Sequence, residues 1–277
     1  GEAVAELVEG ECEGVGEGAG LGHRPPLVAE QQLHLARRVQ VAAALERDGF
    51  DRAALTDLAN HYHALYQDKR LLKQKEENYQ EATYWYREFL QSFPEDVTAP
   101  KLNNQLAGLL LEHKDFLGAA LEYERTAYNY PTHDEYASAG YAAVYAYREH
   151  LKVVDQSQRN IVKREVIRSS LKFAEFFPTH KNAAIVLVAA VDDLYALEDY
   201  EQAVIYGRRA IKVYPNADSK LLRSAWMVVA HASFDLASYK DAEQAYKETL
   251  ALTDKDKETI DKKVRAAAEK LQLTNFL

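Results

Sequence analysis

The sequence has little cysteine, little glycine after residue 22, and no long hydrophobic run. One of its 277 residues is a cysteine, Cys12, so the chain has neither an internal disulfide nor a zinc site of several thiolates. No stretch of about 18 apolar residues occurs, so we predict no transmembrane segment. The net charge is −9. Because Lys and Arg do not gather into a basic stripe, we also predict no nucleic-acid binding.

Most of the glycines and most of the excess negative charge lie at the start of the chain. Seven of the 12 glycines fall in residues 1–22, and residues 1–30 carry seven glutamates against one arginine. Glycine costs backbone entropy, like charges repel, and Pro25-Pro26 blocks a helix. We therefore predict that residues 1–30 are a flexible acidic leader outside the fold, with an acidic interaction arm as the alternative.

After this segment the composition is typical of helices. Ala, Leu, Glu, Lys, Gln and Tyr dominate from Gln31 onward, and no alternating strand pattern occurs. Residues 31–47 are predicted to form a first amphipathic helix that ends at Asp48-Gly49. The sequence thus predicts an all-α chain.

An aromatic residue followed by proline recurs four times along this helical region. The pairs are Phe93-Pro94, Tyr130-Pro131, Phe177-Pro178 and Tyr214-Pro215, with intervals of 37, 47 and 37 residues between the prolines. Proline ends a helix because it lacks an N–H and restricts the residue before it. The spacing therefore indicates helical repeats.

The residues before each proline fall into one register. Ala82, Tyr86, Phe89 and Pro94 stand at relative positions 0, 4, 7 and 12, which place the first three on one helical face. The same spacing relates three further sets: Ala119, Tyr123, Thr126 and Pro131; Ala203, Gly207, Ala210 and Pro215; and Ala242, Tyr246, Thr249 and Asp254. A looser version is Val166, Ser170, Phe173 and Pro178. A second helix, with a small-residue pair such as Leu58-Ala59, precedes each set.

In this pattern the sequence resembles the tetratricopeptide repeat (TPR) family, whose skeleton is W-x2-L-G-x2-Y…A-x3-F-x2-A-x4-P. The resemblance implies an α-solenoid of about five TPR-like antiparallel helix pairs in a right-handed superhelix, with flanking helices, over residues 31–277. The units are about 51–94, 102–131, 134–178, 184–215 and 223–254, and a terminal helix at about 256–272 either caps the array or begins a further repeat. The run from Tyr84 to Pro94 and the run Glu201-Gln202-Ala203-Val204 look most like bacterial envelope members, of the outer-membrane assembly and Tol-Pal-associated type.

The resemblance also implies a binding surface. In such a superhelix the first helix of each unit lines the concave face, and the register assigns polar and aromatic residues to it: Asn60, His63, Asn104, Glu112, Tyr141, Tyr145, Asp192, Tyr195, His231, Phe234 and Asp235. A groove of this composition suits an extended peptide or a partner helix. The alternative is that these side chains pack between neighbouring helices.

The sequence contains no recognisable catalytic or metal-binding motif, and we expect no cofactor and no metal. His61 and His63 stand two residues apart on a helix, so their side chains diverge and do not share a metal. Some family members clamp a C-terminal carboxylate with basic groove residues. Here those positions are occupied by Asn60, Asn104, Asp192 and Asp235, with Lys101 as the one nearby base, so such a clamp is not expected.

We therefore expect a non-enzymatic scaffold that binds a protein or peptide partner, with self-association or a larger complex as a further option. The envelope resemblance favours the periplasm or the outer-membrane surface, and the cytoplasm stays open. Two alternatives are kept: a fragment of a larger TPR protein in polysaccharide export or secretion, and a regulatory domain associated with an enzyme.

Overall fold

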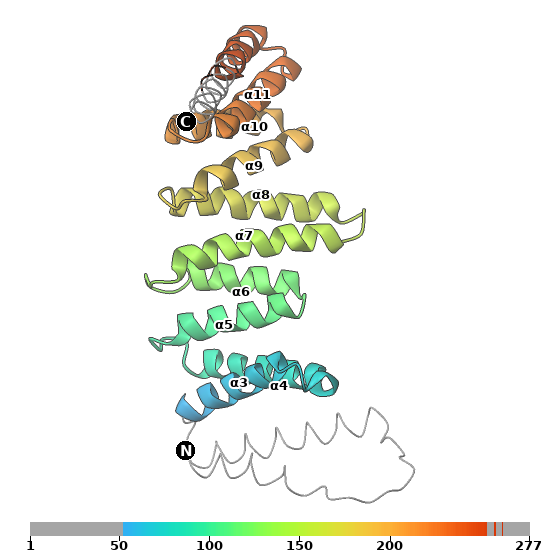
Figure 1. The fold of residues 1–277 in the computed structure, drawn as a ribbon, viewed down its shortest axis with the longest axis vertical. Coiled ribbons are helices and arrows are strands. Elements are labelled where there is room, and N and C mark those ends of the chain that lie inside the picture. The colour runs from blue at the N-terminus through green and yellow to red at the C-terminus, as the bar shows by residue number, and fades with distance from the viewer. Residues whose placement is uncertain (1–51, 254–257, 259–261, 263–277) are drawn as a thin grey trace, which may run out of the picture. The chain divides into compact units, whose positions relative to one another are not determined.

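The computed structural model describes residues 52–253, together with residues 258 and 262. Every regular element in this part of the chain is helical (Figure 1). The α-helices are α3 (Arg52–Gln67), α4 (Lys75–Ser92), α5 (Ala99–Glu112), α6 (Phe116–Tyr128), α7 (Tyr136–Val153), α8 (Arg159–Phe176), α9 (Ala183–Ala196), α10 (Tyr200–Val213) and α11 (Ser219–Asp235). A short 3-10 helix, η1 (Leu72–Gln74), precedes α4, and residues 239–253 are helical after α11.

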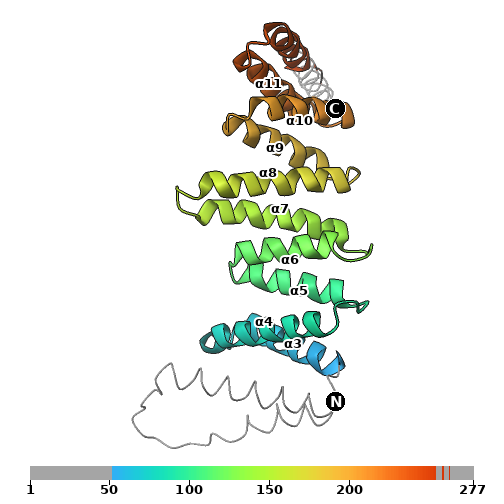
Figure 2. The same cartoon turned by 180° about the vertical axis from the view of Figure 1, so that it is seen from behind.

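These helices follow one another as antiparallel pairs joined by short turns. The pairs are α3 with α4, α5 with α6, α7 with α8, α9 with α10, and α11 with the helix at 239–253. The chain divides into two compact units, unit 1 up to Thr126 and unit 2 from Ala127. In unit 2, α7 and α8 lie side by side in both views (Figures 1 and 2). For the described residues, the prediction of an all-α chain of antiparallel helix pairs is confirmed.

Three of the four aromatic-proline pairs end their helices in one shared backbone conformation. Phe93, Phe177 and Tyr214 have φ between −131° and −118° and ψ of 56–58°, outside the α-helical region, as expected before proline. The N–H of each still donates to the carbonyl oxygen four residues back, at 2.8–2.9 Å. Each helix thus keeps its last hydrogen bond before the chain turns to the next pair.

Three turns inside the pairs contain a residue with positive φ that is not glycine. These residues are Lys114 (68°), Glu198 (61°) and Ala237 (56°). In each turn the following N–H donates to the carbonyl oxygen five residues back, at 2.8–3.0 Å. This left-handed ending satisfies carbonyl groups that a helix leaves free at its C-terminus.

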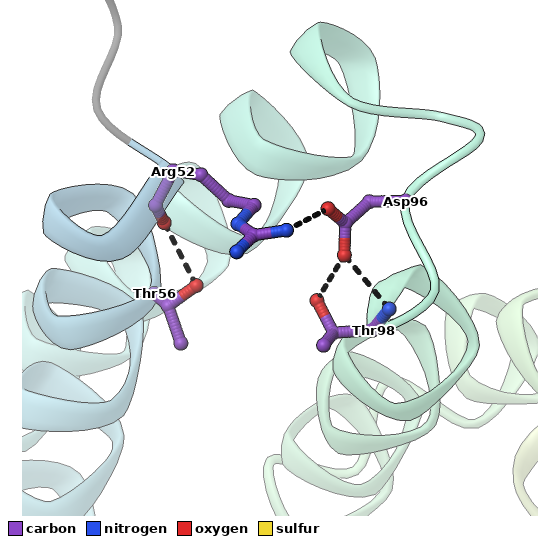
Figure 3. Close-up of polar contacts among 4 residues, drawn as sticks. All are labelled: Arg52, Thr56, Asp96 and Thr98. Carbon is purple, nitrogen blue, oxygen red and sulfur yellow. Dashed lines mark hydrogen bonds and ion pairs between the residues drawn. The ribbon is translucent and has the colours of Figure 1, made fainter.

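Unit 1 is held by a buried aromatic layer and by a polar contact at one end. Trp85, Tyr86 and Phe89 on α4 are 0–2% exposed. At the end, Arg52 Nη1 lies 2.7 Å from Asp96 Oδ2, and Asp96 Oδ1 accepts from the N–H and the hydroxyl of Thr98 at 2.8 and 2.6 Å (Figure 3). The Thr98 hydrogen bonds and the Arg52 guanidinium lower the pKa of Asp96 to about 2. The start of α3 is thereby tied to the turn that leads into α5.

Unit 2 buries both aromatic and aliphatic side chains between its helices. Phe173 and Val144 pack together where α8 meets α7, and Val191 and Val229 are fully buried between α9, α10 and α11. Gly207 takes the position that holds tyrosine in other repeats. A Cβ atom at Gly207 would lie 2.6 Å from Val229 Cγ2, so the branched valine already occupies the space that an aromatic ring fills elsewhere.

Two of the predicted units, about 51–94 and 134–178, are longer than the other three, and they accommodate their extra residues differently. In the stretch at 67–78 the chain forms η1 and then begins α4 at Lys75. In the stretch near 150–160, α7 and α8 each extend to 18 residues.

Several predictions lie outside the described residues: the leader at 1–30, the helix at 31–47 and most of the terminal helix at 256–272. The right-handed superhelix concerns the arrangement of the whole array and stays a prediction.

Candidate binding face on the first helices

The eleven predicted groove residues lie on the first helix of each pair. Four belong to unit 1, on α3 and α5: Asn60, His63, Asn104 and Glu112. Seven belong to unit 2, on α7, α9 and α11: Tyr141, Tyr145, Asp192, Tyr195, His231, Phe234 and Asp235. We describe each unit's first-helix face separately.

In unit 1 the half-buried His63 belongs to a hydrogen-bonded network. Its Nδ1 lies 2.9 Å from the Tyr86 hydroxyl, and that hydroxyl donates to Asn60 Oδ1 at 3.3 Å. Its Nε2 lies 3.3 Å from the Gln67 side-chain nitrogen, which donates to the Glu112 carboxylate at 2.9 and 3.2 Å. A neutral imidazole with its proton on Nδ1 satisfies every one of these contacts. Burial lowers the pKa of His63, and the nearby Glu112 carboxylate opposes that shift.

Beside this network is an aromatic stack. Tyr79 and His113 lie face to face, with ring centroids 3.5 Å apart and planes 9° apart, and the buried Tyr66 contacts both rings. Asn104 is half-buried on α5. Unit 1 therefore brings Asn60, His63 and Glu112 together through side chains of the protein itself.

The α7 part of the unit 2 face shows exposed tyrosines. Tyr145 is 48% exposed and Tyr141 38%. The Tyr141 ring also stacks on His180 at 5.8 Å and contacts Phe173 at 5.9 Å, so part of it packs against α8 and the turn that follows. Tyr145 is thus the freer of the two.

Charged groups on α9 are unevenly neutralised. Asp193 accepts ion pairs from Arg148 at 3.1 Å and Lys163 at 4.0 Å. Asp192 is exposed and has no ion pair within the described part of the chain. Desolvation and the adjacent Asp193 carboxylate raise the pKa of Asp192, and Arg148 acts in the opposite sense.

The ends of α9 and α11 come together in a cluster of aromatic rings and one carboxylate. The Tyr195 hydroxyl donates to Asp235 Oδ2 at 2.9 Å, and the Tyr195 ring lies 6.1 Å from His231 and 5.4 Å from Tyr200. His231 Nδ1 lies 3.0 Å from the Tyr246 hydroxyl. We call these five residues the Tyr195–Asp235 cluster. The bond to Asp235, followed by desolvation, raises the pKa of Tyr195.

Phe234 extends the face beyond this cluster. It is 56% exposed, and its ring meets Tyr239, itself 62% exposed, at 5.4 Å. The structure therefore gathers Tyr195, His231 and Asp235, and it leaves Phe234 pointing at solvent on the same helix.

Four residues that the repeat register does not assign to the groove complete the two faces: Gln67, Arg148, Tyr200 and Tyr246. Gln67 follows His63 by four residues and Arg148 follows Tyr145 by three, so helical spacing alone could have placed them on the same face. Tyr246 was expected in the core, yet it is half-buried and its hydroxyl reaches His231. Tyr200 opens α10, and no pattern on the first helices points to it.

No feature of the described residues indicates a metal or cofactor. They contain no group of three or more His, Cys, Asp or Glu side chains placed to hold a metal ion. The two best-formed hollows are open to solvent, one of about 340 Å³ between Arg87 and Arg125 and one of about 330 Å³ near Pro178 and Pro215. Among the described helices, none combines the length and the apolar character that crossing a membrane requires.

Comparison with known proteins gives structural likeness alone. No protein-family model and no curated protein matches the chain. Among the similar solved structures is a crystal structure of MamA, at 13% identity, with 69% of this chain and 98% of that chain covered and a TM-score of 0.39. BtubC (BKLC) from P. vanneervenii matches at 16% identity, with 84% and 93% covered and a TM-score of 0.40. MamA 41-end from Desulfovibrio magneticus RS-1 matches at 16%, with 72% and 97% covered and a TM-score of 0.37. Scores and identities at this level carry no functional argument.

Proposed function

We propose that the protein is a non-enzymatic scaffold that binds an extended peptide or a partner helix on the first-helix face of unit 2. One observation carries the proposal: large aromatic side chains are exposed along this face. Tyr145 on α7 is 48% exposed and Phe234 on α11 is 56% exposed. Aromatic rings contribute much of the energy of protein interfaces because they bury a large area for few rotatable bonds.

The packing of the helices that carry this face supports the same proposal. The face is built on helices that pack against one another, with α9 in contact with both α10 and α11. A rigid face loses little conformational entropy when a partner binds, so the partner alone bears the ordering cost.

The test is the double variant Tyr145→Ser/Phe234→Ser, with partner capture and thermal unfolding measured in parallel. We expect the variant to lose most of the partner signal in a pull-down from the native source, followed by mass spectrometry, with an unchanged melting curve. Both side chains are largely exposed, so their removal costs little folding energy.

The matched control is Ile205→Ser, on the second helix α10 of the same unit, where the side chain is 55% exposed. This variant should capture the partner as the unaltered chain does. If the control loses the partner as fully as the double variant, binding does not depend on the first-helix face. If the double variant keeps the partner, the proposal is wrong.

We further propose that this scaffold acts in a bacterial envelope assembly, in the periplasm or at the outer membrane. The support is the sequence pattern of the repeats that end in an aromatic residue and proline, such as the run from Tyr84 to Pro94. Cell fractionation of the native source with an antibody against the chain tests the location. A signal confined to the cytoplasm contradicts it and leaves the binding face untouched.

A further inference from the structure

The Tyr195–Asp235 cluster has the chemistry of a site for a positively charged side chain. Tyr195, Tyr200, His231 and Tyr246 offer aromatic rings around the Asp235 carboxylate, and none of the five residues is buried. Aromatic faces attract cations through their quadrupole, and a carboxylate adds a direct charge. We propose that the cluster binds a Lys or Arg side chain of the partner polypeptide, an inference that rests on the scaffold function above.

The position of Asp235 is fixed by its one hydrogen-bond donor. Tyr195, on the neighbouring helix α9, donates to Oδ2 at 2.9 Å, and Asp235 as a whole is exposed. Within the described part of the chain Asp235 has no basic partner. A second carboxylate on the same face, Asp192, also lacks an ion pair there. A cation that reaches Asp235 therefore displaces water and no protein side chain.

The segments of α9 and α11 nearest to Asp235 carry acidic residues and no Lys or Arg. Helix α9 contains no Lys or Arg, and neither does the stretch 224–239, which includes the last part of α11 and the following turn. These two segments contain Asp192, Asp193 and Asp235, and the turn that follows α9 adds Glu198 and Asp199. Arg148 and Lys163 pair with Asp193 alone. A basic ligand is favoured by this field, and an acidic ligand such as a C-terminal carboxylate or a phosphate is repelled.

The aromatic surroundings define the rest of the ligand. Phe234 and Tyr239 form an exposed ring pair adjacent in sequence to Asp235. An apolar residue next to the basic residue of the ligand would cover these rings. The cluster therefore fits a short segment with a Lys or Arg beside an apolar side chain.

The experiment is a selection of random 12-residue peptides displayed on phage, with the whole chain as bait. We expect the selected peptides to be enriched in Lys and Arg next to an apolar residue. A selected peptide is then synthesised with its basic residue kept or replaced by norleucine, which has a similar length and no charge. Affinities are measured by fluorescence anisotropy.

Asp235→Asn should weaken the binding of the basic peptide about tenfold. This is the effect expected when a desolvated cation loses its contact with a carboxylate beside an aromatic ring. The norleucine peptide should bind the unaltered chain about as weakly, and combining the two changes should cause no further loss, because both remove one interaction. The matched control is Glu243→Gln, which removes the same charge from a carboxylate paired with Lys247. It should bind the basic peptide normally. Melting curves establish that each variant is folded.

The outcomes separate the two proposals. Selected peptides without basic enrichment, or a basic peptide that ignores Asp235→Asn, overturn the cation site and leave the scaffold standing if Tyr145→Ser/Phe234→Ser still abolishes their binding. A selection that yields no peptide above background overturns both.

Discussion

The first-helix faces of the two units have similar residue types and use them differently. In unit 1, His63 is bonded to Tyr86 and Gln67, and Gln67 connects it to Glu112. In unit 2, Tyr145 and Phe234 are about half exposed. The side chains of His63, Gln67 and Glu112 in unit 1 are thus bonded to one another, and the aromatic surface of unit 2 is open.

The difference shows that the register of a repeat assigns a residue to a face and does not decide whether a ligand can use it. A ligand on unit 1 would have to break hydrogen bonds that already exist, and a broken bond leaves a polar group unpaired. A ligand on unit 2 gains from apolar area that is now in water. This difference is why we propose a binding site on unit 2.

The largest effect is expected where the two faces share one position, Tyr86 in unit 1 and Tyr246 in unit 2. Tyr86 is fully buried and its hydroxyl contacts His63 and Asn60, so Tyr86→Ala should lower the free energy of unfolding by about 3–5 kcal/mol. Tyr246 is half-buried, and Tyr246→Ala should cost about 1–2 kcal/mol. The loss of stability caused by Tyr86→Ala is measured by amide hydrogen exchange in α3 and α4. The loss caused by Tyr246→Ala is measured by amide hydrogen exchange in α11. Equal costs would show that the two positions do not differ as described.

The next effect concerns two glycines that face opposite surroundings. In unit 2 a Cβ at Gly207 would lie 2.6 Å from Val229 Cγ2 and 3.4 Å from Val191 Cγ1. Overpacking of about 1–3 kcal/mol should outweigh a gain in helix propensity of about 1 kcal/mol, so Gly207→Ala destabilises. In unit 1 a Cβ at Gly108 meets only the Tyr123 hydroxyl, at 3.7 Å, so Gly108→Ala should stabilise. Urea unfolding of both variants measures whether each substitution lowers or raises the free energy of unfolding. If Gly207→Ala instead stabilises the protein, the side chain of Val229 can move aside at little energetic cost.

Much of this fold could be predicted from the sequence because its signals are local. Proline fixes where a helix ends, and the spacing of Ala82, Tyr86 and Phe89 fixes which face is buried. These signals located the helix pairs and put all eleven candidate residues on first helices. The polar extra residues of the unit at about 134–178 are compatible with longer helices or with a longer turn, and the structure has longer helices.

The remaining features depend on contacts between residues distant in sequence. Gly207 has no aromatic ring because Val229 fills its space, and no local pattern reports that. The bond between Tyr195 and Asp235 joins residues 40 positions apart. The partial packing of Tyr141 on His180 depends on how the turn after α8 folds back. The candidate site could therefore be predicted as a face, and its grouping into a network and a cluster could not.

A smaller, stabilising effect is expected in the turns, where the units should behave alike. Lys114 in unit 1 and Glu198 in unit 2 have positive φ, a conformation that costs non-glycine residues about 1–2 kcal/mol. Lys114→Gly and Glu198→Gly should each raise the free energy of unfolding by about 0.5–1 kcal/mol, because the greater freedom of glycine in the unfolded chain offsets part of the gain. Leu197→Gly is the control: Leu197 has φ of −93°, so the change should destabilise. Thermal unfolding of the three glycine variants compares their stabilities. If Lys114→Gly and Glu198→Gly both destabilise the protein, the positive φ of these residues is not a source of strain.

The smallest effect is a pH dependence that distinguishes the internal network of unit 1. Burial lowers the pKa of His63 below its ordinary value of 6.5, so the unfolded chain binds a proton more readily than the folded one. The contribution of neutral His63 to stability is therefore complete above pH 6.5 and is lost as the pH falls from there through the folded pKa. His63→Gln should reduce the stability lost between pH 7.5 and pH 5.5, measured by hydrogen exchange in α3 and α4. Burial also lowers the pKa of His180, so part of the dependence should remain, in unit 2. If His63→Gln leaves the pH dependence of α3 and α4 unchanged, the protonation of His63 is not coupled to the folding of unit 1, and the network described for that face does not hold the imidazole neutral.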